Sequence, residues 1–318
     1  MKSSSPHFGK SAIVLAGGGT RGAYEAGGIQ YLRTQLPQSL ASRLHFDLIL
    51  GSSVGAINAA FMAATEDDLL QQGQRIVQLW EGIQTTDIYR RGPVTLGKFL
   101  LRSLLGISSH LLGIDLVKPN DPNFKFQGLF DTKPFFHFMS KQTPFANVQK
   151  NMDQGLFDAL VISATNVHTG MVELFVQHRT ALPPGIRFKI HPGKIQTKHV
   201  MASAALPVLF PPVPIHGAYY NDGGLRLKTP LAPAVSMGAD RVLIVGTRHT
   251  PVYPTLTEDI QQGERPAPNL ANILGKFFNA VFLDRLETDR EQLDRINRIL
   301  EACRQSTTPE TFAKICET

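Results

Sequence analysis

The stretch Phe46-Asp47-Leu48-Ile49-Leu50-Gly51-Ser52-Ser53-Val54-Gly55 decides the fold. Its first half is a short apolar run of the kind that forms a buried strand, and its second half is a turn flanked by glycines. Ala56 to Ala64 follows and is rich in good helix formers. The same order of strand, tight turn and helix occurs earlier, where Ser11 to Ala16 runs into Gly17-Gly18-Gly19-Thr20-Arg21-Gly22 and a helix-compatible stretch stopped by Pro37. Repeated units of this kind are typical of an α/β domain.

The rest of the chain continues the alternation of strands and helices. Ala159 to Ala164 and Met171 to Gln177 are apolar runs separated by turn residues, and we expect them to form a hairpin. Thr197 to Leu206 is helix-like until Pro207, and Arg241 to Val245 is predicted to be a buried strand. The sequence therefore predicts a three-layer α/β/α fold, in which a central, mixed but mainly parallel sheet lies between helices.

Short signals mark turns and the starts of helices. Thr65-Glu66-Asp67-Asp68 is a capping-box pattern ahead of an amphipathic helix, and Thr229-Pro230 has the favoured order for the first turn of another. Asn221-Asp222-Gly223-Gly224 is typical of a tight turn. We expect a helix to begin at each of the first two signals.

The organisation of the chain predicts one domain. We interpret residues 1–318 as a single domain with a cap or insertion at residues 86–130, because prolines and glycines interrupt that segment around a leucine-rich stretch. Residues 268–318 are predicted to form a C-terminal helical extension, since leucine and isoleucine recur at helical spacing between residues 283 and 300.

Composition excludes several classes of protein. The chain has 318 residues, of which 42% are hydrophobic and 18% charged, so it is not a disordered, collagen-like or coiled-coil protein. Its net charge of +6 is not concentrated in a run of Lys and Arg, and we therefore expect no nucleic-acid partner. This charge favours solubility or a weak attraction to anionic lipid headgroups.

Cysteine usage and hydropathy predict the compartment. Cys303 and Cys316 do not make a disulfide framework, and no Sec-type signal is visible. The most lipid-like stretch, Leu96 to Val117, is interrupted by charged residues and is not expected to span a bilayer. We expect a cytoplasmic protein that contacts membranes peripherally at most, and export by a route without a Sec signal is left open.

Ser53 is the candidate nucleophile. Gly51 to Gly55 fits the pattern G-x-S-x-G, a sharp turn between strand and helix that exposes a serine hydroxyl above the sheet. The flanking glycines allow the backbone to fold tightly where a Cβ atom would collide. The hydroxyl would lie at a helix N-terminus, where unpaired N–H groups favour negative charge on the attacking oxygen.

The glycine loop Gly17 to Gly22 is compatible with two uses. It fits the dinucleotide-binding pattern G-x-G-x-x-G, but that fingerprint needs an acidic residue about 20 positions further on, and Ser39 to Leu44 contains none. No Gly-Lys-Ser/Thr sequence follows, which argues against a P-loop. The other use is as an oxyanion hole, in which consecutive backbone N–H groups point at a developing alkoxide.

Two charged residues complete the candidate site. Asp222 is the best-placed acceptor for the serine proton, because its Asp-Gly-Gly turn can aim a carboxylate while keeping the backbone close. Arg21 either adds positive charge near the site and contacts a substrate phosphate, or forms a structural ion pair. Histidines and cysteines show no metal-ligand spacing, so we expect neither a metal nor another cofactor.

Four motifs together resemble those of a known family. The chain is similar to the patatin-like phospholipases over Ser11 to about Val245, and the motifs that carry the resemblance occur in the family's order: Gly17 to Gly22, Gly51 to Gly55, Ala202-Ser203-Ala204-Ala205-Leu206-Pro207, and Asp222-Gly223-Gly224. The resemblance implies a patatin-like fold and hydrolysis of lipid acyl esters by a Ser-Asp dyad without a catalytic histidine.

The roles carried over from the family follow these motifs. Ser53 would be the nucleophile, Asp222 the base, and the amides of Gly17, Gly18 and Gly19 the oxyanion donors. The segment Ala202 to Pro207 would support the site structurally. The implied substrate is a membrane phospholipid or lysophospholipid, with an oligomeric state that the sequence leaves unknown.

Two alternatives remain at this point. One is a Ser-Asp-His triad acting as an esterase or lipase of neutral lipids, in which His249, the only histidine after Asp222, would be the base. The other is a nucleotide-binding sensor module that uses the glycine loop, with the serine incidental.

Overall fold

The computed structural model describes residues 9–41, 43–90 and 128–247, together with Arg298, Gln305 and Thr308. The chain divides into two compact units, Met1–His249 and Thr250–Thr318, and all the described strands lie in the first. Most of the predicted insertion at residues 86–130 and nearly all of the predicted extension at residues 268–318 lie outside the described residues. The domain organisation therefore stays a prediction.

A mixed sheet forms the centre of the first unit, with the strand order β5-β4-β3-β2-β1-β8. The strands are β1 (Ser11–Leu15), β2 (Leu48–Ser52), β3 (Ala159–Asn166), β4 (Val172–His178), β5 (Lys189–Pro192), β6 (Val213–Ile215), β7 (Ala218–Asp222) and β8 (Arg241–Val245). Strand β1 pairs in parallel with β2 and β8, and β2 pairs in parallel with β3. Strands β3 and β4 are antiparallel, as expected for the predicted hairpin.

One irregularity of this sheet positions the site. Strand β3 is longer than β2, and its first five residues pair with the whole of β2. Its last three residues pair instead with β7, so that Ala164 lies opposite Asp222. The end of β7 therefore occupies the place beside β3 that β2 leaves free when the chain turns into a helix after Ser52.

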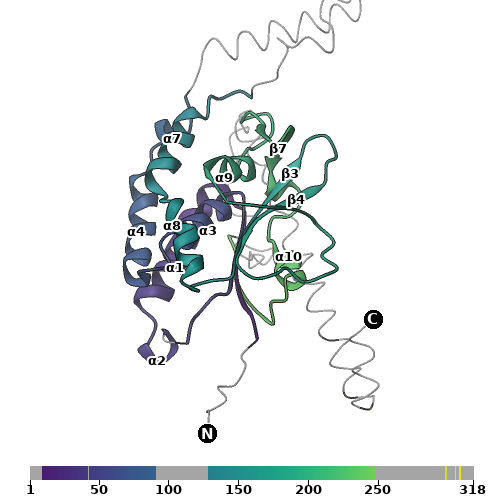
Figure 1. Cartoon of the computed structure of the whole chain (residues 1–318). Helices are drawn as coiled ribbons and strands as arrows, with labels where there is room; N and C mark the ends of the chain where they lie inside the picture. Colours follow the sequence, from purple (N-terminus) through teal and green to yellow (C-terminus); the bar gives the residue numbers. More distant parts are fainter. Residues whose placement is uncertain are drawn as a thin grey trace, which may run out of the picture. The chain divides into compact units, whose positions relative to one another are not determined.

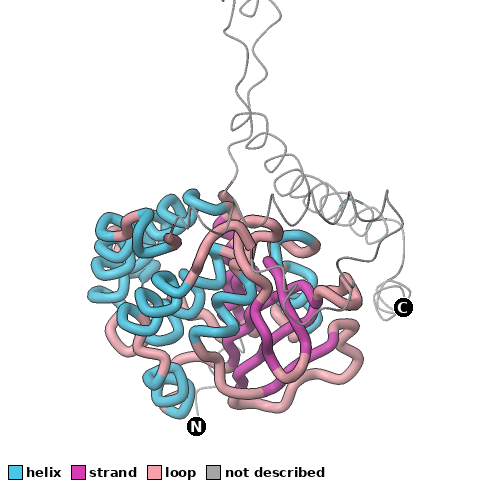
Figure 2. The backbone as a smooth tube through the Cα atoms, turned by 90° about the horizontal axis from the view of Figure 1, so that it is seen from above, coloured by secondary structure: helices cyan, strands magenta, loops and turns pink. Residues whose placement is uncertain are grey.

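Helices cover the sheet on both faces (Figures 1 and 2). They are α1 (Gly22–Thr34), α2 (Gln38–Ala41), α3 (Val54–Ala64), α4 (Leu69–Gly82), α5 (Thr85–Ile88), α7 (Lys133–Gln142), α8 (Ala146–Asp153), α9 (Thr197–Ser203) and α10 (Leu231–Ser236). In Figure 1, α1, α3, α4, α7 and α8 lie on one side of the sheet and α10 on the other. This arrangement confirms the predicted three-layer α/β/α fold.

The alternation of side chains along the strands divides the core in two. Ile13 and Ile49 point into a large apolar core shared with the thicker helical layer, whereas Val14 and Leu50 point into a smaller core under α10. Both sets are buried because a sheet covered on both faces carries near-continuous apolar strands. Helix α3 lies inside the larger core and is buried along its entire length.

The structure corrects three predicted boundaries. Helix α4 begins after Asp68, whose side chain accepts the N–H of Gln71, so the predicted capping box at Thr65 is wrong. The Thr65 hydroxyl instead donates to the carbonyl oxygen of Phe61 at the end of α3. Helix α9 ends at Ser203 rather than continuing to Leu206, and α10 starts one residue beyond the predicted Thr229-Pro230 turn.

Among the described residues, no helix combines the length and apolar composition that a bilayer-crossing segment requires.

Candidate active site

Ser53 occupies the sharp turn between β2 and α3. Its backbone adopts φ +53° and ψ −124°, a conformation that a residue with a Cβ atom rarely takes. The tightness of the turn requires its two glycines: a Cβ atom on Gly51 would collide with the carbonyl oxygen of Gly55, and one on Gly55 would collide with that of Leu15. The predicted G-x-S-x-G stretch therefore forms a strained turn that presents Ser53 at the N-terminus of a buried helix.

Asp222 lies at the end of β7 and contacts Ser53 directly. The Ser53 hydroxyl donates to Asp222 Oδ2, with 2.6 Å between the two oxygens. The other carboxylate oxygen accepts the N–H of Gly224 at 2.6 Å, and the hydroxyl of Thr165 donates to the Asp222 carbonyl oxygen at 2.9 Å. The two side chains, 169 positions apart in sequence, thus form one hydrogen-bonded pair.

Burial controls the basicity of this carboxylate. Asp222 is only 1% exposed, and its burial raises the pKa to about 7, against the hydrogen bonds from Ser53 and Gly224, which lower it. An exposed aspartate would be fully ionised at neutral pH and a weak base. Near pH 7, Asp222 therefore exchanges a proton readily with a hydrogen-bonded partner.

The glycine loop lies against Ser53. A Cβ atom on Gly17 would be 3.2 Å from the Cβ of Ser53. The N–H of Gly17 donates to the carbonyl oxygen of Lys228 at 2.8 Å, so the predicted role of Gly17 as an oxyanion donor conflicts with a bond that it already makes. In the described part of the chain, the N–H groups of Gly18 and Gly19 donate to no protein acceptor.

Arg21 lies near the end of the same loop, in the short 3-10 helix Gly19–Arg21. Its exposed guanidinium donates to the carbonyl oxygen of Thr247 at a long distance of 3.4 Å. It forms no ion pair with any described residue. The structural ion pair considered for Arg21 is therefore absent within the described part of the chain.

Two buried contacts behind the pair were not identified as functional in the sequence. The N–H of Ser53 donates to the hydroxyl of Ser203 at 2.9 Å, and the N–H of Asp222 donates to the carbonyl oxygen of Ala205 at 2.9 Å. The only signal for them in the sequence was the position of Ser203 and Ala205 within the motif Ala202 to Pro207, which indicated a supporting role without a contact.

A buried polar network that the sequence analysis missed lies beneath the glycine loop. Glu25 on α1 is fully buried and accepts a hydrogen bond from the Asn58 amide at 2.9 Å. The Asn58 side-chain oxygen accepts the indole N–H of Trp80 at 2.8 Å. Burial raises the pKa of Glu25 to about 8, despite the hydrogen bond from Asn58, so this carboxyl group is mostly protonated at pH 7. The sequence gives one sign of this burial: Glu25 lies four positions before Ile29, on the same face of the helix, and Ile29 is buried.

We predict that Glu25 makes the stability of the protein fall at alkaline pH. The folded state holds the Glu25 proton more tightly than the unfolded state does. The resulting contribution to the free energy of unfolding is therefore complete below about pH 4.5 and is lost as pH rises towards 8. Between pH 6 and pH 9 the wild type should lose about 3 kcal/mol more free energy of unfolding than Glu25→Gln, which cannot ionise. Urea unfolding at the two pH values measures this difference. The exposed Glu81→Gln variant is the control, and equal pH dependence in Glu25→Gln and wild type would contradict the prediction.

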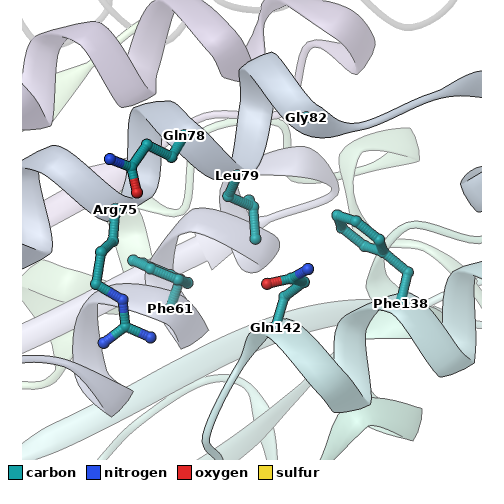
Figure 3. A pocket seen from close by; sticks show the side chains of 7 residues that line it. All are labelled: Phe61, Arg75, Gln78, Leu79, Gly82, Phe138 and Gln142. Carbon is teal, nitrogen blue, oxygen red and sulfur yellow. The ribbon is translucent and has the colours of Figure 1, made fainter.

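A separate hollow lies within the helical layer. The hollow has a volume of about 160 Å³. Figure 3 shows the residues of α3, α4 and α7 that line it: Phe61, Arg75, Gln78, Leu79, Gly82, Phe138 and Gln142. It includes neither member of the Ser53–Asp222 pair. Across residues 9–41, 43–90 and 128–247, no three His, Cys, Asp or Glu side chains gather as metal ligands do.

Comparison with known proteins identifies the family of this chain. A solved structure, VipD from Legionella pneumophila, is similar at 18% sequence identity and a TM-score of 0.39. The similarity covers 74% of this chain and 49% of VipD, so the chain spans about half the length of that protein. No curated protein matches the chain. The family model of patatin-like phospholipases matches residues 13–235, which is well over half of the sequence. The chain therefore belongs to the patatin-like phospholipase family.

Proposed function

We propose that the protein hydrolyses fatty acyl esters of phospholipids or lysophospholipids through a Ser53–Asp222 dyad and an acyl-serine intermediate. Membership of the patatin-like phospholipases supports lipid acyl hydrolysis in general. The observation that carries the specific proposal is the hydrogen bond of 2.6 Å between Ser53 Oγ and Asp222 Oδ2. A serine hydroxyl is a weak nucleophile until an adjacent base accepts its proton, and this contact supplies such a base.

The first half of the reaction acylates Ser53. The Asp222 carboxylate accepts the hydroxyl proton while Ser53 Oγ attacks the ester carbonyl carbon, and the carbonyl oxygen becomes an oxyanion. The N–H groups of Gly18 and Gly19 are the donors available to stabilise this charge, together with the N-terminus of α3. When the tetrahedral intermediate collapses, the departing alcohol takes the proton from Asp222.

The second half releases the fatty acid. Asp222, ionised again, accepts a proton from water as the water oxygen attacks the acyl-serine. The fatty acid then leaves, and Ser53 Oγ recovers the proton from Asp222. The nucleophile, the base and the oxyanion donors are all protein groups, so the reaction as proposed needs no cofactor.

The direct contact favours a dyad over a triad. In a Ser-His-Asp triad the imidazole lies between the serine and the carboxylate, whereas here the two side chains are bonded to each other. Both carboxylate oxygens of Asp222 are already occupied, by Ser53 and Gly224. His249, the histidine of the alternative triad, lies outside the described residues.

Arg21 favours a phosphate-bearing substrate. Arg21 belongs to the same loop as the proposed oxyanion donors, and within the described residues its exposed guanidinium makes one long hydrogen bond. A guanidinium binds a phosphate through two parallel hydrogen bonds, which suits a phospholipid headgroup. The net charge of +6 also favours approach to an anionic bilayer surface, where we propose that the reaction takes place.

The experiment combines covalent labelling with lipid analysis. The wild type should react with a fluorophosphonate at Ser53, as located by peptide mass spectrometry, and should release fatty acid from vesicles of phosphatidylcholine and phosphatidylglycerol. Arg21→Gln should lower kcat/KM on these phospholipids about tenfold and leave that on a neutral diglyceride unchanged. Absence of both labelling and fatty acid release would refute the hydrolase. Equal losses on both lipids would refute only the role of Arg21.

A further inference from the structure

We propose that Ser203 is a positioning residue that, together with the Ala205 carbonyl, sets the distance between Ser53 and Asp222. We call the segment Ser203–Ala205 the clamp. This inference rests on the proposed function, because it concerns how the reacting pair is aligned. The clamp itself contributes no atom to the proposed reaction.

The sheet links the two reacting residues indirectly, through β3. Ser53 follows β2, whereas Asp222 ends β7, and β7 pairs with β3 and β6 rather than with β2. The backbone ladders connect the two segments through β3, where Ser52 lies opposite Ser163 and Asp222 opposite Ala164, but Ser53 itself lies beyond the last paired residue of β2. Any relative shift of these two segments would change the 2.6 Å contact between Ser53 and Asp222.

The clamp connects the two reacting residues to one short segment. The Ser203 hydroxyl accepts the N–H of Ser53 at 2.9 Å, and the Ala205 carbonyl oxygen accepts the N–H of Asp222 at 2.9 Å. Both bonds involve main-chain N–H groups of the reacting residues. One short segment thus holds both reacting residues by their backbone nitrogens. The position of the backbone in turn fixes the point from which each side chain extends.

Ser203 is the member of the clamp that a substitution can test. The N–H of Ser53 lies beyond the last paired residue of β2, and the Ser203 hydroxyl is its acceptor. Ser203 is fully buried, so water does not readily replace the lost hydroxyl. A Ser53 without this bond has greater freedom to move away from Asp222, and misplacement by about 1 Å costs on the order of 100-fold in rate.

The clamp is itself held at both ends. At the start of α9, the N–H of Gln196 donates to Nδ1 of His199 at 2.9 Å, and burial lowers the pKa of His199 to about 4, so the neutral ring accepts this bond at pH 7. After the clamp, the N–H of Phe210 donates to the Leu206 carbonyl oxygen at 2.8 Å. The Phe210 ring packs edge-on against Phe130, with 6.4 Å between the ring centroids. These contacts make the clamp a fixed reference for the reacting pair.

The test compares three substitutions of Ser203 on a soluble p-nitrophenyl acyl ester. Ser203→Ala should lower kcat about 100-fold with KM changed by less than about twofold, because alignment and not binding is lost. Ser203→Cys keeps the buried volume but offers a poor acceptor, and should behave like Ser203→Ala. Ser203→Thr keeps the hydroxyl and should recover most of the activity. Ser140→Ala, which removes a hydroxyl bonded to the opposite end of α9, is the matched control and should keep wild-type kcat.

The pH profile separates positioning from a purely structural role. The hydrogen bond from Ser53 lowers the pKa of Asp222, so weakening that bond should move the acid limb of kcat/KM to higher pH in Ser203→Ala. Reduced stability alone would leave this limb in place. If Ser203→Ala does not fold, Ser203→Cys decides the question, because it preserves the packing.

The outcomes distinguish this proposal from the proposed function. A wild type that neither reacts with the fluorophosphonate nor hydrolyses esters would refute the hydrolase itself. An active wild type whose folded Ser203→Ala or Ser203→Cys variant keeps wild-type kcat and the same acid limb would refute the clamp alone.

Discussion

Replacing Ser53 by alanine is expected to reduce ester hydrolysis at least about 10⁴-fold and to abolish labelling by a fluorophosphonate. The variant loses the oxygen that forms the acyl ester, and no change in pH or substrate concentration restores it. Steady-state hydrolysis of a p-nitrophenyl ester and mass spectrometry of the labelled protein measure the two effects. The turn itself should survive, since the Ser53→Ala substitution adds no atoms to the buried site.

The neighbouring serine provides a matched control. Ser52 is fully buried at the end of β2, and its hydroxyl has no hydrogen-bond partner among the described residues. Ser52→Ala should therefore keep both folding and labelling. If Ser53→Ala retained labelling, or if Ser52→Ala alone lost it, the assignment of the nucleophile would be wrong.

Asp222→Asn is expected to lower kcat at least about 10³-fold while leaving the structure in place. The amide has the same shape as the carboxylate and can still accept a hydrogen bond, but it cannot take the serine proton. The exposed Asp153→Asn on α8 is the control for removing a carboxylate elsewhere, and it should keep wild-type activity.

The pH dependence gives an independent measure of the same group. Asp222 acts as a base only when ionised, and its pKa of about 7 places the change at neutral pH. Wild-type kcat/KM should therefore rise as pH increases through about 7, and this limb should be absent from the residual activity of Asp222→Asn. A pH-independent wild-type rate between pH 5 and pH 9 would contradict the role of Asp222.

His249 discriminates between dyad and triad within the same set of assays. In a dyad, His249→Ala should keep most of the esterase activity. A loss of about a thousandfold or more, with Asp222→Asn much less affected, would favour the triad instead.

Some parts of the fold were accessible from local sequence patterns. The apolar runs that become β1, β2, β3 and β4 are continuous, because a strand covered on both faces is apolar along its length. The run Arg241 to Val245 was predicted to be a buried strand, and this prediction is wrong in part: β8 forms, but at the edge of the sheet, where its residues are exposed or half-buried. Strands β5, β6 and β7 were not predicted. They are short and partly exposed, and Asn221-Asp222-Gly223-Gly224 resembles a turn more than the end of a strand. A local sequence pattern is weak evidence for a strand that forms only because it pairs with a strand distant in the sequence.

In the candidate site, too, some features were visible in the sequence and others depend on the tertiary structure. Glycine is the only residue that fits Gly51 and Gly55, so the pattern around Ser53 was visible in sequence. The engagement of the Gly17 amide by Lys228, by contrast, depends on how the segment before α10 folds back onto the loop. The burial of Glu25 likewise depends on the helices that pack around it.

The sequence by itself determined the residues of the turns, because steric limits on the backbone act between near neighbours and leave a recognisable pattern of glycines. Only the tertiary structure decided that Ser53 and Asp222 touch, that burial makes Asp222 a stronger base, and that Ser203 and Ala205 hold both. Those properties depend on distances and solvent exclusion between segments far apart in the chain, which no local pattern encodes.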